Sequence, residues 1–102
     1  MRDNEQIREL YLGENKLVAA TDGPTLASIV KDAKALELFD LRSNTSLADL
    51  GLSFLCSALS VDGVRLKSLI LLNCGITQSG VPYLCKVVIK SINIYVYNTK
   101  NV

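Results

Sequence analysis

The chain is dominated by a pattern of apolar residues that recurs three times at nearly constant spacing. The pattern starts at Ile7, Leu36 and Leu66, so its copies are separated by 29 and 30 residues. Each copy fixes five positions, of which the fourth is Asn or Cys and the others are apolar. The copies are Ile7, Leu10, Leu12, Asn15 and Leu17; Leu36, Phe39, Leu41, Asn44 and Leu47; and Leu66, Leu69, Leu71, Cys74 and Ile76. Self-similarity at this period predicts a fold of stacked units, here called the first, second and third units.

The start of each copy predicts a short β-strand. Around Leu10-Tyr11-Leu12 the apolar residues alternate with others, which sends Leu10 and Leu12 to one face of the strand and Tyr11 to the other. The same alternation applies in the second and third copies. The side chains expected on the outward face are Glu9, Tyr11, Gly13, Leu38, Asp40, Arg42, Ser68, Ile70 and Leu72.

One position after each strand, where the chain must turn out of the sheet, holds Asn15, Asn44 or Cys74. Such a turn places backbone N–H and C=O groups away from water. An Asn side chain can bond these groups because it carries both donors and an acceptor. We therefore expect a structural ladder of these three residues, in which Cys74 stands in for Asn.

Each unit continues into a segment with helical periodicity. The first helix is expected to open at Thr21-Asp22-Gly23-Pro24, because Pro is favoured early in a helix. Asp49 is the expected N-cap of the second helix. The apolar faces are Leu26, Ile29, Val30 and Ala33; Leu52, Leu55, Cys56 and Leu59; and Val81, Leu84, Cys85 and Val88. Gly51 and Gly80 match between the second and third helices, which supports the repeat independently of the strands.

These features indicate an α/β fold, a leucine-rich repeat solenoid of about three strand-turn-helix repeats. A parallel sheet is expected on the concave side and helices on the convex side, because no unit can bury its apolar face alone. The repeats are expected at about residues 7–35, 36–65 and 66–90. Residues 1–6 are expected to fray. Residues 91–102 are expected to form a degenerate strand or tail, since they are rich in β-formers but lack a ladder residue and a helix.

The charge composition restricts the partners. A net charge of +1 argues against generic binding to nucleic acids or membranes. Residues 1–62 carry six Lys or Arg against ten Asp or Glu, whereas residues 63–102 carry five Lys or Arg and no acid. We interpret this asymmetry as variation in surface composition rather than as a basic face.

The sequence favours an intracellular setting, cytoplasmic or nuclear. The first nine residues are charged and lack the apolar stretch of a secretory signal. Lys86 and Lys90 interrupt the C-terminal apolar segment, so no run is long enough to predict a transmembrane helix. The cysteines Cys56, Cys74 and Cys85 are odd in number and occupy apolar positions, which favours a reducing compartment. Without histidine or closely spaced cysteines, a zinc site is not expected.

No catalytic constellation is present, so we expect no catalytic residue, cofactor or metal. Asp40 and Arg42 share a strand face and could form a charged site, but a solvated charge pair is the favoured interpretation. Cys74 could be a reactive thiol, but packing in the ladder is favoured, since nothing nearby would lower its pKa. Cys56 and Cys85 are one repeat apart and are expected to lie near each other as small buried hydrophobes.

The concave sheet is the surface expected to bind a partner. Its candidate residues are Glu9, Tyr11, Leu38, Asp40, Arg42, Ser68, Ile70 and Leu72. Apolar side chains exposed among charges suit a protein partner. Two alternatives remain open: neighbouring loops cover some of these residues, or Leu72 merely flanks the ladder.

Several runs resemble known repeats. The run Arg8-Glu9-Leu10-Tyr11-Leu12 with Asn15-Lys16-Leu17 resembles the ribonuclease-inhibitor-like leucine-rich repeats. So do Asp40-Leu41-Arg42 with Asn44, Asp49-x-Gly51-Leu52, and Leu55-Cys56 with Leu59. Over about residues 6–88, their order and spacing are similar to the repeats of a family of protein phosphatase 1 regulatory subunits. That resemblance implies an intracellular protein that binds the phosphatase catalytic subunit and restrains its activity.

One departure bears on how such a partner would be held. Regulators of this phosphatase dock through a short segment of the type basic-x-Val/Ile-x-Phe/Trp, and neither Phe39 nor Phe54 has that context. The resemblance places the docking segment outside the repeats. The phosphatase is therefore expected to be bound through regions outside this chain, and no docking residue carries over.

Other functions are compatible with the same repeats. One is an unrelated intracellular adaptor or receptor segment. Another is a GTPase-activating protein of the Ran type, which would need an Arg placed to reach a nucleotide, and Arg8, Arg42 and Arg65 give no sign of that role. The uncapped ends of the stack also leave a route to self-association.

Overall fold

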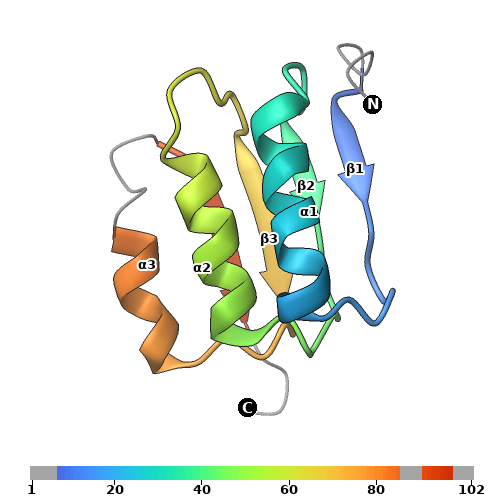
Figure 1. The fold of residues 1–102 in the computed structure, drawn as a ribbon, viewed down its shortest axis with the longest axis vertical. Helices are drawn as coiled ribbons and strands as arrows, with labels where there is room; N and C mark the ends of the chain where they lie inside the picture. Colours follow the sequence, from blue (N-terminus) through green and yellow to red (C-terminus); the bar gives the residue numbers. More distant parts are fainter. Residues whose placement is uncertain (1–6, 86–90, 98–102) are drawn as a thin grey trace.

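A computed structural model describes residues 7–85 and 91–97 of the chain. The elements in order are β1 (Glu9–Tyr11), α1 (Ala19–Asp32), β2 (Leu38–Asp40), α2 (Ala48–Leu59), β3 (Ser68–Leu72), the 3-10 helix η1 (Gln78–Gly80), α3 (Val81–Cys85) and β4 (Asn93–Tyr97). Strands and helices alternate along this part of the chain (Figure 1). The predicted α/β class is confirmed.

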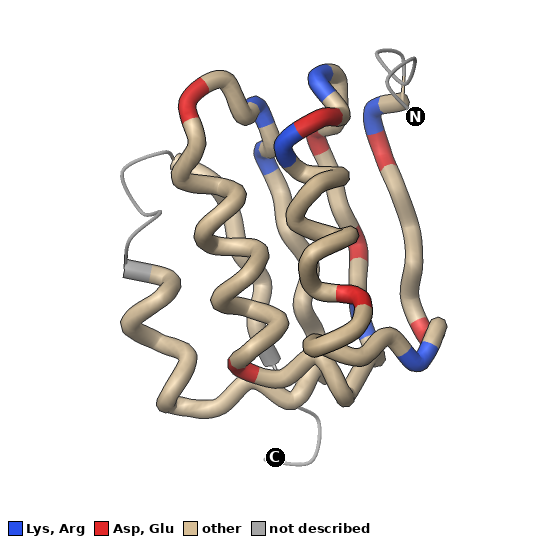
Figure 2. Tube along the Cα trace, viewed as in Figure 1, with Lys and Arg blue, Asp and Glu red and all other residues tan. Residues whose placement is uncertain are grey.

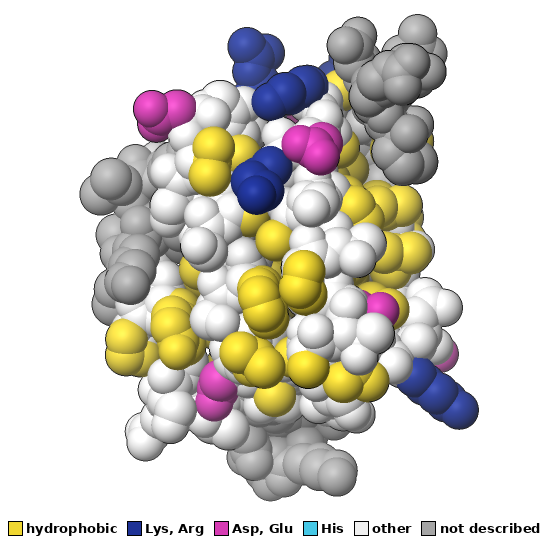
Figure 3. Space-filling model, in the orientation of Figure 1, with side chains coloured by type: hydrophobic (Ala, Val, Ile, Leu, Met, Phe, Trp, Pro, Cys, Tyr) yellow, Lys and Arg dark blue, Asp and Glu magenta, His cyan; other side chains and the backbone are white. Residues whose placement is uncertain are grey.

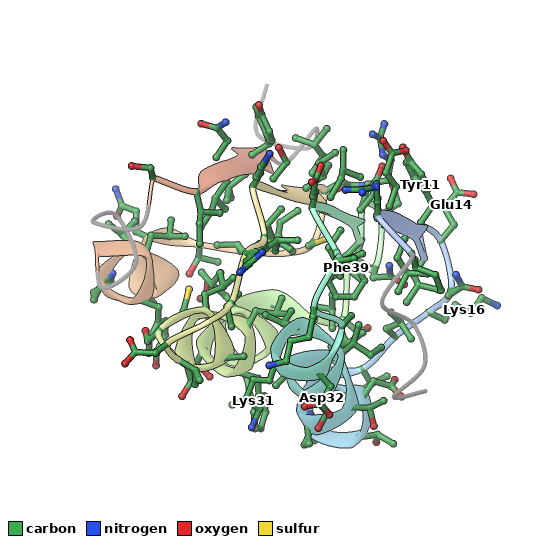
Figure 4. All side chains as sticks on the ribbon, turned by 90° about the horizontal axis from the view of Figure 1, so that it is seen from above. Tyr11, Glu14, Lys16, Lys31, Asp32 and Phe39 are labelled. Atoms are coloured by element: carbon green, nitrogen blue, oxygen red, sulfur yellow. The ribbon has the colours of Figure 1, made fainter. Side chains whose placement is uncertain are left out.

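The described strands form one parallel sheet in the order β1-β2-β3-β4. Leu10 pairs with Phe39 and Phe39 with Leu69, the register that the shared frame predicts. β4 extends the sheet, with Ile94 opposite Leu69. The helices lie on one face of the sheet, and no described helix lies on the other (Figures 1 and 4). We call this second face the open face.

The hydrophobic core lies between the sheet and the helices. Its most deeply buried aliphatic and aromatic side chains are Phe39, Leu41, Leu47, Leu52, Leu55, Leu59, Leu69 and Leu71. Six of these eight belong to the second unit, which the first and third units flank. Leu10, Leu12 and Leu17 of the first unit are only partly buried. Because a fully buried Leu contributes about 1.5–3 kcal/mol, the middle unit contributes most of the hydrophobic stabilisation.

Helix α1 starts earlier than the sequence predicts. It begins at Ala19, so Pro24 lies inside the helix rather than at its opening. The start is fixed by Asp22, whose carboxylate accepts a hydrogen bond from the backbone N–H of Val18 at 2.8 Å. The backbone N–H of Ala19 also donates to the C=O of Ser46 in the second unit. These two contacts, one within the first unit and one to the second, outweigh the local preference of Pro for the first turn.

Helix α2 buries the face that its periodicity predicts, but Asp49 is not its N-cap. The N-cap is Leu47, and Asp49 lies in the first turn. One carboxylate oxygen of Asp49 accepts the backbone N–H of Thr77 at 2.8 Å, and the other accepts the Thr77 hydroxyl at 2.5 Å. Asp49 therefore joins the second unit to the third instead of capping its own helix.

The third helical segment is shorter and more open. It consists of η1 followed by α3, and the side chain of Thr77 caps η1 by accepting the N–H of Ser79. A Cβ atom at Gly80 would lie 2.5 Å from the Asp49 carboxylate, so the close approach of the two units requires glycine there. Val81 is 49% exposed, contrary to its predicted place on a buried face, because no described unit covers its outer side. Val88 lies outside the described residues.

The turns after the first three strands share one backbone shape. The residue before each ladder position has a left-handed conformation, with φ of 57° at Glu14, 62° at Ser43 and 57° at Asn73. This conformation costs L-residues other than Gly roughly 1–2 kcal/mol, so interactions elsewhere must offset it. In the second and third units this geometry points the ladder side chain toward the preceding unit.

The side chain of Asn44 makes hydrogen bonds that offset this conformational cost at the second turn. This side chain is completely buried. The amide oxygen accepts the backbone N–H groups of Asn15 and Leu17 at 2.9 and 3.0 Å. The amide nitrogen donates to the C=O groups of Leu12 and Leu41 at 2.9 and 2.8 Å. One side chain thus satisfies polar groups of two units. Asn15, the corresponding residue of the first unit, is exposed, and its amide nitrogen donates to the C=O of Gly13.

We predict that replacing Asn44 by Ala destabilises the protein far more than replacing Asn15 by Ala. Asn44→Ala would remove the side-chain partner of the N–H groups of Asn15 and Leu17 and of the C=O of Leu12, at about 1–3 kcal/mol for each group that water cannot reach. We expect the free energy of unfolding, measured by urea denaturation, to fall by at least about 3 kcal/mol. Asn15→Ala is the matched control and should cost less than about 1 kcal/mol. Equal losses for the two variants would contradict this role of Asn44.

Candidate functional site

The open face of the sheet carries the side chains for which partner binding was predicted. Glu9, Tyr11 and Arg42 are exposed; Leu38, Ser68, Ile70 and Leu72 are half-buried; and Asp40 is buried. Tyr11 points away from the helices, whereas Phe39 on the neighbouring strand points toward them (Figure 4). The strand alternation therefore separates a core face from a face available to another molecule.

A shallow hollow of about 340 Å³ lies in the middle of the open face. It is lined by Leu38, Arg42, Ser68, Ile70, Leu72 and Tyr95. All of these except Tyr95 were predicted from the sequence, whereas Glu9, Tyr11 and Asp40 lie outside the hollow. Tyr95 was not among the predicted residues, because its segment lacks a ladder residue. The alternation along β4 was the available signal, since Tyr95 lies opposite Ile70 in the register.

Asp40 and Arg42 do not form a solvated pair. Asp40 is 3% exposed, and the guanidinium of Arg42 lies over its carboxylate. The Arg42 Nε donates to both carboxylate oxygens, at 3.0 and 2.9 Å, and the backbone N–H of Arg42 donates to one of them at 3.1 Å. The hydrogen bond to Asp40 raises the pKa of Arg42. Arg42 is therefore accessible to a partner, and Asp40 positions it.

Tyr11 lies at the β1 end of the open face. It is 59% exposed, and its hydroxyl donates to the carboxylate of Glu9 at 2.8 Å. This hydrogen bond raises the pKa of Tyr11. The phenol therefore stays protonated at neutral pH and presents an aromatic ring together with a polar group.

Cys74 occupies the third ladder position as a buried thiol. It is completely buried, and its Sγ donates to the C=O of Leu41 at 3.1 Å. Burial raises the pKa of the Cys74 thiol, and the backbone groups of Asn44 and Ser43 offset this only in part. A thiol in this state is a poor nucleophile. Cys56 is also buried, and the side chain of Cys85 lies outside the described part of the structure.

The described residues of the open face present apolar, aromatic and cationic groups to the surroundings. Within residues 7–85 and 91–97, no group of three or more His, Cys, Asp or Glu side chains is arranged to hold a metal ion. No helix in the same ranges is both long and apolar enough to cross a membrane. The open face combines the aliphatic side chains of the hollow with the accessible cation of Arg42 and the aromatic rings of Tyr11 and Tyr95.

The chain is similar to regulatory proteins of a phosphatase. It is 32% identical over 95 residues to a protein phosphatase 1 regulatory subunit 37 homolog of Caenorhabditis elegans, covering 89% of this chain and 10% of that protein. It is 30% identical over 102 residues to the homolog of Caenorhabditis briggsae, covering 96% of this chain and 11% of that protein. The chain thus spans about a tenth of the length of these relatives.

The chain is also similar to the ribonuclease inhibitor of Mus musculus. The two are 33% identical over 86 residues, which is 84% of this chain and 18% of the inhibitor. The chain matches no protein-family model. Both resemblances inferred from the sequence, to phosphatase regulatory subunits and to ribonuclease-inhibitor-like repeats, are confirmed by these relatives.

We predict that Arg42 stabilises the protein through the buried carboxylate of Asp40. Arg42→Met would keep the aliphatic stem but leave that carboxylate with only its backbone partner, so the urea midpoint should fall clearly. Arg8→Met is the control, because Arg8 pairs at 3.1 Å with the more exposed Glu37. Exposed ion pairs contribute little to stability, so the urea midpoint of Arg8→Met should barely change. Equal shifts would show that the burial of Asp40 does not matter.

We predict that Cys74 resists alkylation in the folded protein. Its raised pKa leaves less thiolate at a given pH than an ordinary cysteine has, and burial blocks access. With iodoacetamide at mildly alkaline pH, mass spectrometry of the Cys74 peptide should show modification at least about tenfold slower than in urea-unfolded protein. Rapid modification of the native protein would refute the buried-thiol interpretation.

Proposed function

We propose that this chain is a section of a leucine-rich repeat solenoid of the ribonuclease-inhibitor-like class. The repeats would comprise about residues 7–35, 36–65 and 66–90, with the open face on the concave side. The parallel register of Leu10, Phe39 and Leu69 supports this arrangement, as does the contact of Asn44 with the preceding unit. The likeness to the mouse ribonuclease inhibitor supports the repeat class.

We further propose that the chain is a non-catalytic protein-interaction module within an inhibitory regulatory subunit of protein phosphatase 1. The observation that carries this proposal is the similarity of nine-tenths of the chain to two proteins named as homologs of such a subunit. The open face supports the interaction role, because it groups half-buried aliphatic side chains around an accessible Arg. Tyr and Arg are among the side chains enriched at the hot spots of protein interfaces.

The contact with the phosphatase is proposed to lie outside this chain. Phe39 is completely buried, so it could serve as a docking residue only if the core opened. Phe54 lies within α2 and is half-buried among helical neighbours, not in an extended segment. The section described here would then position the docking segment or hold another partner on its open face.

Two other functions are compatible with the same repeats. The likeness to the ribonuclease inhibitor is equally compatible with a general leucine-rich repeat adaptor or receptor segment. A Ran-type GTPase-activating protein would need a free Arg directed at a nucleotide. Arg42 is engaged by Asp40 and Arg8 by Glu37, which makes both poor candidates for that role. Arg65 forms no ion pair with a carboxylate among the described residues, so it is the Arg that the following assay tests. A GTP-hydrolysis assay in which the protein gives no acceleration would remove this second alternative.

The proposal predicts how phosphatase binding divides between this chain and the protein that contains it. The full-length protein should retain purified phosphatase catalytic subunit in a pull-down and lower its activity, because it includes the docking segment. Residues 1–102 alone should retain none above background. Retention by neither protein would remove the phosphatase assignment. Retention by the short chain would place the contact within the repeats and contradict the proposed location.

A further inference from the structure

A second surface, distinct from the open face, lies where the strands begin. Lys and Arg are frequent at this end of the molecule, where Asp and Glu also lie (Figures 2 and 3). There, a hollow of about 450 Å³ is lined by Arg8, Lys34, Ala35, Glu37, Arg65 and Lys67. We call it the rim hollow. Its four cations come from both halves of the sequence, so counting charges along the chain could not reveal it.

The backbone fixes the spacing of three of these charges. The N–H of Glu37 donates to the C=O of Arg8 at 2.8 Å, and the N–H of Lys67 donates to the C=O of Glu37 at 2.9 Å. Arg8, Glu37 and Lys67 therefore form a row across neighbouring units, about 4.8 Å apart. The row belongs to the start of the sheet and does not depend on the conformation of a long loop.

The cations of the rim hollow are only partly neutralised. Glu37 pairs with Arg8 at 3.1 Å and with Lys67 at 3.8 Å, so one carboxylate is shared between two cations. Lys34 donates to the C=O of Lys31 at the end of α1. Arg65 forms no ion pair with any carboxylate among the described residues. Four cations thus face one carboxylate, and Arg65 is the cation most available to a ligand.

We propose that the rim hollow binds an acidic segment of a protein partner, with a carboxylate of that segment paired to Arg65. Guanidinium groups hold carboxylates through two parallel hydrogen bonds, which suits Arg65 at an accessible site. The side chains of Arg8 and Lys67, oriented by Glu37, would bind neighbouring carboxylates and hasten association. This interaction is separate from the proposed function, because it uses the edge where the strands begin and not the open face of the sheet.

Features of the rim hollow favour an acidic peptide over a nucleic acid. No aromatic side chain lines the hollow, so bases have no ring to stack on. Glu37 lies between two of the cations and would repel a continuous row of phosphates. Separate carboxylates on a flexible peptide can be placed around Glu37. The net charge of +1 also gives little of the long-range attraction on which nucleic-acid binding depends.

The test measures binding of a fluorescein-labelled peptide of alternating Glu and Gly by anisotropy at physiological ionic strength, where charges more than about 8 Å apart are largely screened. Arg65→Glu should weaken binding by about tenfold or more, because it reverses the charge of the ligand-binding cation. Lys16→Glu changes the net charge equally but lies in the turn after β1, at the opposite end of the sheet, and should weaken binding by less than about twofold. Glu37→Gln, which removes the competing carboxylate, should tighten binding. Thermal melting of each variant checks that it folds.

Three results would overturn the assignment. The first is no measurable binding of the peptide by the unaltered protein. The second is an equal loss of peptide affinity for Lys16→Glu and Arg65→Glu, which would show that only the net charge of the protein matters. The third is tighter binding of a single-stranded oligonucleotide with the same number of charges, which would identify a phosphate-binding surface. The opposite direction expected for Glu37→Gln keeps the proposal testable even if Arg65→Glu is unstable.

Discussion

The strands of this protein are only three to five residues long, so the sheet depends on the turns that follow them. The amide of Asn44 meets this need by pairing backbone groups of two units at once. The left-handed residues Glu14, Ser43 and Asn73 set the turn, and their conformational cost must be offset by such pairing. A fold of this kind depends on polar bonds between units in addition to its aliphatic core.

The sequence predicted the parts of the structure that follow from periodicity. The alternation placed Leu10, Phe39 and Leu69 side by side, and the helical spacing gave the buried face of α2. Some errors arose where a contact with another unit decided the local structure, as at Asp49 and at the start of α1. Asp49 bonds Thr77 some 28 residues away, so its capping preference was a poor guide. Local rules cannot identify partners that only stacking brings close.

On the candidate surfaces too, periodicity predicted which face a residue occupies but not which residues it contacts. Leu38, Ile70 and Leu72 could be assigned to the open face by counting alternate positions. The burial of Asp40 beneath Arg42 could not be predicted, because it depends on how a long side chain folds back over its own strand. The rim hollow was also beyond prediction, since its cations lie on three separate segments. The sequence specifies which face a residue occupies more readily than which neighbours it meets there.

The substitution at the third ladder position changes how the second and third units are joined. Where Asn44 makes several strong bonds inside the protein, Cys74 offers a single weak donor to the C=O of Leu41. The same two units meet again at the surface, where Asp49 binds Thr77. The seam between these units therefore has, besides its backbone pairing, a charged side-chain bond at the surface and only a weak side-chain bond inside. Local opening should begin along that seam, with the strands beyond it separating before the first two units lose their register.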